Sequence, residues 1–223
     1  DTAIHSKGRR NWINEHTGPI QTEADLDNPS FWPSVDQLID YELFADVGEM
    51  LPPGMAVVGG VAGGPFEHVM FKMGIEALSL AFYDKPRFVK RFVDKVGELL
   101  AGAAKRLAGL SMIGAYRFAD DMGYKTATLI SPGKLRELIF PWHKRIVAIA
   151  HEAGKPFVLH ACGNLEQVMD DLINEVHIDA KQANEDVIMP IEEVKRRWGD
   201  RVAILGGLDL GFLCTATPPQ VAE

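Results

Sequence analysis

The sequence has little cysteine: Cys162 and Cys214 are the two cysteines in 223 residues. Two cysteines are too few for the disulfide framework of a small secreted domain, and no signal peptide is recognisable. We therefore expect reduced thiols and a cytoplasmic protein. Long apolar runs are missing too, because charges or glycines interrupt each run well before the roughly 20 residues that a membrane-spanning helix needs. The sequence predicts no transmembrane segment and no membrane partner.

Positive charge is also scarce. The chain carries 23 Lys and Arg against 31 Asp and Glu, which gives a formal net charge of -8. Nucleic-acid binding depends on clustered basic residues, and no such cluster stands out, so we expect no nucleic-acid partner. The hydrophobic share of 47% and the charged share of 24% are ordinary for a soluble protein with one sizeable core.

Apolar, β-prone segments alternate with helical patterns along most of the chain. The patterns predict strands at residues 56–58, 113–118, 157–159, 176–180 and 202–205, and helices at 66–107 in about three pieces, from 131 to 154, from 164 onward and at 190–198. Residues 1–54 predict irregular structure with one or two short helices. Strands that alternate with helices favour an α/β fold with a parallel sheet, either a barrel or a doubly wound sheet.

His160 and Cys162 stand two residues apart at the end of the strand predicted at 157–159. In an extended backbone alternate side chains share a face, so both point the same way at the carboxyl end of the strand, where α/β folds place their sites. An imidazole and a thiolate on one face form half of a zinc site. The alternative is a hydrogen-bonded core histidine beside a buried thiol, because two ligands alone are a weak pattern.

Residues 59–64 form a glycine-rich turn, GGVAGG, directly after the first predicted strand. Glycine lets the backbone approach a neighbouring group closely. No Lys-Ser/Thr pair follows, and the glycine spacing is not that of a dinucleotide fingerprint. We therefore favour a tight turn between strand and helix over a phosphate site.

Several polar residues fall near the ends of the predicted strands. Asp121 and Asp209 are candidate catalytic residues that orient a substrate or take up protons. For Asp120 and Asp121 the alternative is a turn that caps a helix. Further candidates, for substrate binding at the same end of the sheet, are Glu67, Arg117, Gln182 and Glu185. For the last two, the alternative is that they are solvated loop residues.

Four motifs resemble those of the uroporphyrinogen decarboxylase superfamily in order and spacing. They are ADDMG at 119–123, ISP at 130–132, LHACGN at 159–164 and LGGLD at 205–209. The resemblance implies a distorted (β/α)8 TIM-like barrel with its site at the carboxyl ends of the strands. Since only about five strands are predicted where a barrel has eight, we expect residues 1–223 to form a single, incomplete barrel domain, a fragment that lacks the ends of the full protein.

The His-x-Cys element resembles one branch of that superfamily, the zinc-dependent methyltransferases that move methyl groups between corrinoid proteins and thiols or related acceptors. The resemblance implies that His160 and Cys162 bind zinc and that a partner protein supplies a methylcorrinoid. The third ligand in that branch is a cysteine on a later strand, which this chain does not contain. Cys214 is the other cysteine here, and Asp121 or Glu67 could supply an oxygen ligand instead.

Two other functions remain open. The first is a metal-free decarboxylase of an acidic tetrapyrrole, with Asp121 or Asp209 placed against the charge that develops on a pyrrole. A polyacid needs several basic residues, and Arg117 is the obvious candidate near a motif. The second is a barrel that binds a corrinoid or a small methylated compound without turnover. Bound zinc would disfavour both.

Overall fold

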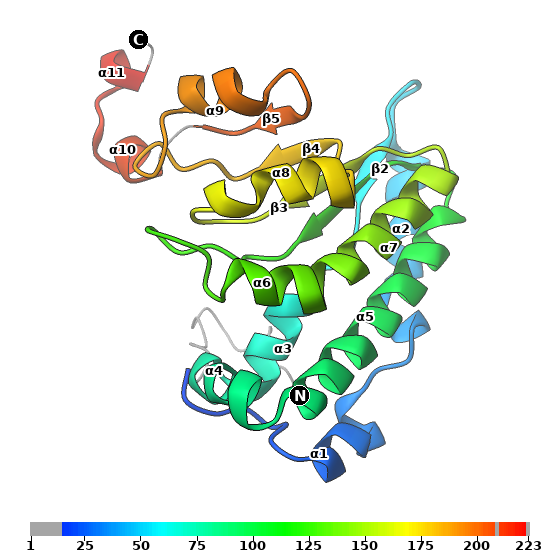
Figure 1. The fold of residues 1–223 in the computed structure, drawn as a ribbon. Helices are drawn as coiled ribbons and strands as arrows, with labels where there is room; N and C mark the ends of the chain where they lie inside the picture. Colours follow the sequence, from blue (N-terminus) through cyan, green and yellow to red (C-terminus); the bar gives the residue numbers. More distant parts are fainter. Residues whose placement is uncertain (1–14, 208–209, 222–223) are drawn as a thin grey trace.

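A computed structural model describes residues 15–207 and 210–221. Its five strands lie parallel in one sheet in the order β1-β2-β3-β4-β5 (Figure 1). The strands are β1 (Val57–Gly59), β2 (Ile113–Ala119), β3 (Phe157–His160), β4 (Ala180–Gln182) and β5 (Ala203–Leu205). Each crossover places the next strand beside the previous one, as in a TIM barrel. The α/β class and the partial TIM-like barrel predicted from the sequence are confirmed.

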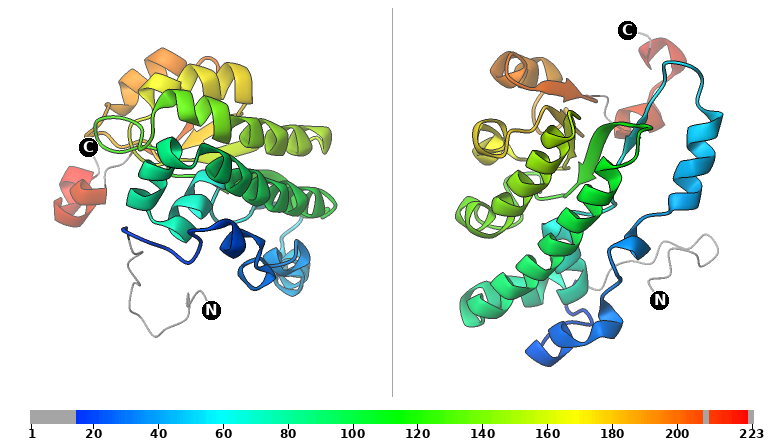
Figure 2. Two further views of the ribbon diagram at one scale, coloured as in Figure 1. Left: turned by 60° about the horizontal axis from the view of Figure 1, so that its bottom comes forward. Right: turned by 90° about the vertical axis from the view of Figure 1, so that its right-hand side faces the viewer.

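The helices that connect the strands gather on one side of the sheet (Figure 2, right). They are α3 (Pro65–Met73), α4 (Ile75–Asp84), α5 (Pro86–Ala108), α6 (Pro132–Lys134), α7 (Phe140–Glu152), α8 (Met169–Asp171) and α9 (Ile191–Trp198), together with the π-helical turns η3 (Leu135–Ile139) and η5 (Leu172–Val176) and the 3-10 turn η4 (Glu166–Val168). Two short helices follow β5, namely α10 (Leu210–Thr215) and α11 (Pro218–Val221). None of the helices in the described ranges combines the length and the apolar character that a bilayer crossing requires.

The described part of the N-terminal segment contains short helices joined by irregular backbone. They are α1 (Glu23–Asp27), the 3-10 turns η1 (Pro29–Phe31) and η2 (Asp36–Leu38), and α2 (Tyr41–Met50). Helix α2 stands on the side of the sheet opposite to the connecting helices (Figure 2, right). A methyl group added at Gly59 in β1 would lie 3.3 Å from a ring carbon of Phe44, so α2 approaches the sheet near β1.

One face of the central strands is fully buried under the connecting helices. Tyr116, Phe118, Phe157 and Leu159 are at most 1% exposed, and the rings of Phe118 and Phe157 lie 6.1 Å apart. The Tyr116 hydroxyl donates to the main-chain carbonyl of Ala104 in α5. Helix α5 has a buried apolar stripe, which comprises Val89, Phe92, Val93, Val96, Leu100 and Ala103. Alternation along the strands therefore leaves the other face, the interior of the barrel, for polar residues.

Two predicted elements differ in detail from the structure. The strand predicted at 176–180 is wrong in its bounds, because β4 begins only at Ala180 and His177 ends the preceding helix in the left-handed conformation, with φ 65°. Val176 and Ile178 are buried at that helix end, which imitates the alternation of a strand. The helix predicted from residue 131 contains the π-helical turn η3. Pro141 explains this turn, because proline lacks an N–H and crowds the carbonyl four residues earlier.

Candidate metal centre

Asp121, His160 and Cys162 meet at the carboxyl ends of β2 and β3. The Nε2 atom of His160 lies 3.5 Å from the Sγ atom of Cys162 and 3.7 Å from Oδ1 of Asp121. One ligand atom from each of the three residues lies within 4.8 Å of the other two. The register between β2 and β3 explains why these residues lie close together. His160 pairs with Ala119, so Cys162 and Asp121, each two positions further in its own segment, also face each other.

The separations of these atoms fit zinc. Tetrahedral zinc with a nitrogen ligand at about 2.0–2.1 Å and a sulfur ligand at about 2.3 Å places the two ligand atoms about 3.5 Å apart, and a nitrogen and an oxygen ligand about 3.4 Å apart. The corresponding distances between His160 and its two neighbours are 3.5 Å to sulfur and 3.7 Å to oxygen. Three protein donors of this kind leave a fourth position for a substrate, as catalytic zinc sites do.

Main-chain hydrogen bonds hold the two ligand-bearing loops together. Oδ1 of Asp121 accepts from the main-chain N–H of Cys162 at 2.7 Å, and the N–H of Gly123 donates to the carbonyl of Cys162 at 3.2 Å. Gly163 has φ 79°, and a methyl group there would lie 2.2 Å from the carbonyl carbon of Gly123. Glu185, after β4, accepts from the N–H of Gly163 at 2.8 Å. Only glycine permits this close approach of the loops.

Asp120, the neighbour of Asp121, has a structural role. Its carboxylate is fully buried and accepts from the main-chain N–H groups of Phe66 at 3.2 Å and Glu67 at 2.8 Å, at the start of α3. It also forms a hydrogen bond of 2.7 Å with Nε2 of the buried His143. Because a side-chain carboxylate occupies these amides, the glycine-rich turn at 59–64 is a tight turn between strand and helix, as we favoured. A methyl group at Gly64 would meet the Asp120 carboxyl carbon at 2.2 Å.

Two groups at the centre have shifted proton affinities. Burial, followed by the negative charges of Asp120 and Asp121, raises the pKa of Glu67 to about 7. Burial, followed by the charge of Asp121, raises the pKa of the Cys162 thiol to about 11. In the metal-free protein this thiol is therefore protonated at neutral pH. Metal binding must displace its proton, which a divalent cation does by stabilising the thiolate.

The second ring nitrogen of His160 has an unusual environment. Its Nδ1 atom is buried and has no hydrogen-bond partner among the described residues. The same ring offers Nε2 to Cys162 and Asp121, so Nε2 is the nitrogen available to a metal. Histidines that bind metals usually donate their other N–H to an acceptor, which fixes the tautomer.

A family comparison assigns the chain. The model of the family described as Uroporphyrinogen decarboxylase (URO-D) matches residues 38–223. The chain belongs to this family. The matched range contains all five strands of the described sheet and the three residues of the candidate centre. The superfamily resemblance of the four sequence motifs is thereby confirmed.

Among solved structures, the URO-D chain is similar to a methyltransferase from Methanosarcina mazei. The two share 19% sequence identity with a TM-score of 0.59, over 74% of this chain and 46% of the other. This similarity shows the fold. The chain spans less than half the length of that structure. No protein of curated function matches the sequence.

The other predicted site residues of this URO-D chain lie in different places. On the inner face of the sheet, Nε of Arg117 donates to Oε1 of Gln182 at 2.6 Å, so these two residues form a pair across β3. Cys214 is exposed on α10 and is not part of the three-residue group. Asp209 lies outside the described residues. The roles assigned to Arg117, Gln182 and Asp209, and the ligand role of Cys214, stay predictions.

Sequence analysis overlooked Lys181, which is 3% exposed although it carries an ammonium group. It follows Ala180 in β4, and its Nζ atom donates to the main-chain carbonyl of Ala183 at 2.6 Å. Burial lowers the pKa of Lys181 to about 8. The sequence did contain a signal, because Lys181 lies inside the short strand β4, between Ala180 and Gln182. A charged side chain inside a buried strand is costly unless other groups compensate its charge. The pairing of His143 with Asp120 was also overlooked, because the two residues lie far apart in sequence.

Proposed function

We propose that this chain is the zinc-binding part of a methyltransferase that moves a methyl group between a corrinoid protein and a thiol or related small acceptor. The observation that carries the proposal is the convergence of Asp121, His160 and Cys162, in which the distances from Nε2 of His160 to the sulfur of Cys162 and to the oxygen of Asp121 match those in tetrahedral zinc sites. Membership of the URO-D family and the fold shared with the Methanosarcina mazei methyltransferase support it. The activity is proposed for a whole protein of which the chain spans one part.

In this proposal Asp121, His160 and Cys162 hold zinc and leave one position open at the mouth of the barrel. Bound zinc lowers the pKa of a coordinated thiol, so that a thiolate nucleophile is available near neutral pH. Asp121 is held in place by the N–H of Cys162, which keeps the ligand set ready before substrate binds. Ligands fixed in advance do not have to be ordered during the reaction.

Glu67 is proposed to take the proton of the incoming thiol. The charge of Asp121 acts on its carboxylate, so Glu67 belongs to the surroundings of the centre, and its pKa of about 7 suits proton exchange near neutrality. In the transfer a sulfur–carbon bond forms and the carbon–cobalt bond breaks. The electron pair of the broken bond stays on cobalt, and the thiol proton goes to Glu67. Run in reverse, the same steps methylate the corrinoid.

The inner-face pair of Arg117 and Gln182, together with Glu185, is proposed to line the substrate site. Arg117 bears directly on the competing proposal of a metal-free decarboxylase, because an acidic tetrapyrrole needs several basic groups. In this structure the Nε–H group of Arg117 donates a hydrogen bond to Gln182. One arginine, with part of its guanidinium bound to Gln182, is less than a polyacid needs and favours a small substrate.

A methyl-transfer assay tests the proposal. Purified protein loaded with zinc is mixed with methylcobalamin, as a stand-in for the corrinoid protein, and 2-mercaptoethanol, and the loss of the methylcobalamin spectrum is followed. We expect zinc-dependent turnover that Cys162→Ser and Asp121→Asn abolish. Cys214→Ser is the matched control, because Cys214 is exposed outside the three-residue group. Release of carbon dioxide from uroporphyrinogen by the metal-free protein, without methyl transfer, would contradict the proposal.

A further inference from the structure

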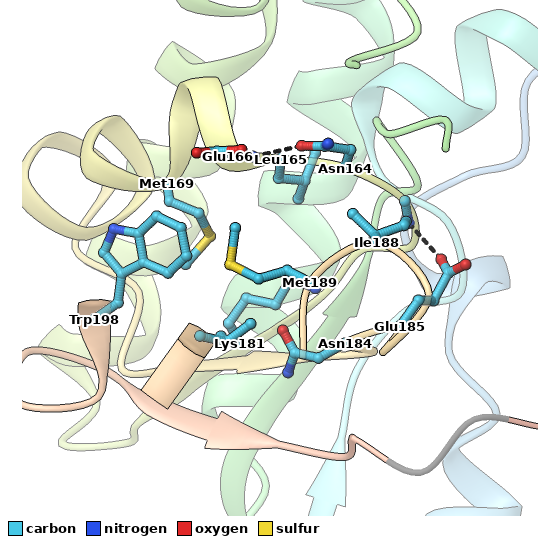
Figure 3. Close-up of a pocket in the computed structure, with 12 residues that line it drawn as sticks. Asn164, Leu165, Glu166, Met169, Lys181, Asn184, Glu185, Ile188, Met189 and Trp198 are labelled. Carbon is cyan, nitrogen blue, oxygen red and sulfur yellow. Dashed lines mark hydrogen bonds between the residues drawn. The ribbon is translucent and has the colours of Figure 1, made fainter. Parts of the chain in front are cut away.

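Lys181 is a buried cation that the proposed reaction leaves without a role. Its side chain lines a small cavity of about 40 Å³ between the ends of β3 and β4 and helix α9. Met169 and Trp198 lie on one side of it, and Asn184 and Glu185 on the other (Figure 3). The apolar walls offer the ammonium little solvation, and such a buried charge is retained only where other charges or dipoles compensate it.

The compensating groups belong to the candidate centre. One direct partner of Nζ is the carbonyl of Ala183, which lies in the left-handed conformation with φ 72° directly after β4. Once a metal has displaced its proton, Cys162 acts on Lys181 through space as a negative charge, together with Glu185 and Asp121. Glu185 links the two regions, because it borders the cavity and also binds the N–H of Gly163, next to Cys162. The ammonium therefore stands behind the ligand-bearing loop.

The sum of the charges at the metal centre indicates which ligand the ammonium of Lys181 would stabilise. A divalent metal is neutralised by the carboxylate of Asp121 and the thiolate of Cys162, while His160 is neutral. A thiolate in the open fourth position then adds one negative charge, in the neighbourhood of the acidic residue Glu185. A nearby buried cation offsets that charge, and its effect is large because water does not screen it.

We infer that Lys181 is a specificity-determining positioning residue, whose buried ammonium favours an anionic thiolate over a neutral ligand in the open position of the metal. This inference rests on the proposed function and specifies its substrate class, a group that binds as an anion. The inference also predicts the effect on metal affinity. A buried cation repels a divalent ion, so Lys181 does not increase the affinity of the site for the metal. A residue needed only for folding would affect all ligands alike.

The test uses the protein loaded with Co²⁺, whose absorption spectrum reports the ligand that occupies the fourth position. Lys181→Met keeps the length of the side chain and removes its charge, and Lys181→Gln is a second variant that keeps polarity. Titration with 2-mercaptoethanol, which binds as a thiolate, is compared with titration by imidazole, which binds as a neutral ligand. We expect thiolate affinity to fall about tenfold or more in both variants, the order of effect that loss of a unit charge has in a partly buried site. Affinity for imidazole and for Co²⁺ should be unchanged or higher.

Lys155→Met is the matched control. Lys155 also donates to main-chain carbonyls, those of Ala108 and Leu110, but it precedes β3 and therefore lies at the opposite end of the sheet. This variant should leave both titrations unchanged. Equal loss of thiolate and imidazole affinity in the Lys181 variants, or no loss of either, overturns the inference while the metal site stands. Failure of the wild-type protein to bind Co²⁺ overturns the proposed function, and the inference with it.

Discussion

Gly163→Ala tests how the close approach of two loops creates the candidate metal centre. In the left-handed conformation of Gly163, φ 79°, an alanine costs about 1 kcal/mol. Its methyl group would also lie 2.2 Å from the carbonyl carbon of Gly123, so the loops must separate. Separation weakens the hydrogen bonds from Gly163 to Glu185 and from Gly123 to Cys162, each worth about 1 kcal/mol. We expect a total loss of about 3 kcal/mol in the free energy of unfolding.

Gly154→Ala separates the conformational part of this loss from the collision. Gly154 has φ 69°, similar to Gly163, but a methyl group there meets no atom within 4 Å. This variant should lose only about 1 kcal/mol. The assay is urea unfolding of the metal-free proteins, followed by competition for Zn²⁺ against a coloured chelator. Zinc affinity should fall about tenfold or more in Gly163→Ala and stay at the wild-type value in Gly154→Ala. Equal stability losses, or wild-type zinc affinity in Gly163→Ala, would refute the described loop packing.

Three further predictions concern charged groups around the centre. In Asp120→Asn an amide N–H replaces one carboxylate oxygen and faces a group that donates a hydrogen bond to Asp120. We expect urea unfolding to show a loss of about 2 kcal/mol in the free energy of unfolding. Glu67 has its pKa raised from 4.5 to about 7, so the folded metal-free protein holds this proton more tightly than the unfolded chain and loses stability as pH rises through that window. Glu67→Gln should flatten this part of the stability profile, and an unchanged slope would contradict it. Because the pKa of Cys162 is about 11, zinc binding releases its proton, and zinc affinity should rise about tenfold per pH unit near neutrality; a pH-independent affinity would argue against thiolate ligation.

Much of this fold follows from patterns within short segments. Apolar runs predicted five parallel strands, and helical patterns predicted the helices between them. The strand at 176–180 was misplaced, because two apolar residues at a buried helix end have the same spacing as a strand. Local pattern cannot distinguish the two cases, since the left-handed conformation of His177 depends on tertiary packing.

The part of the candidate site that lies within one strand was predictable from the sequence, and the part that joins different strands was not. His160 and Cys162 lie two residues apart, so their shared direction follows from strand geometry alone. Asp121 comes from a different strand, and its distance from His160 depends on the register between β2 and β3, which a sequence does not display. Lys181 and the Asp120–His143 pair were overlooked because burial of charged groups is decided by neighbours far along the chain.

Zinc binding by the purified protein tests the central claim most directly. The metal content is determined by elemental analysis after zinc loading and dialysis, for the wild-type protein and for His160→Ala, Cys162→Ser and Cys214→Ser. We predict one zinc per chain in the wild type and in Cys214→Ser, and loss of the metal in the other two variants. A wild-type protein without zinc, or zinc retained at full occupancy in Cys162→Ser, would contradict the account.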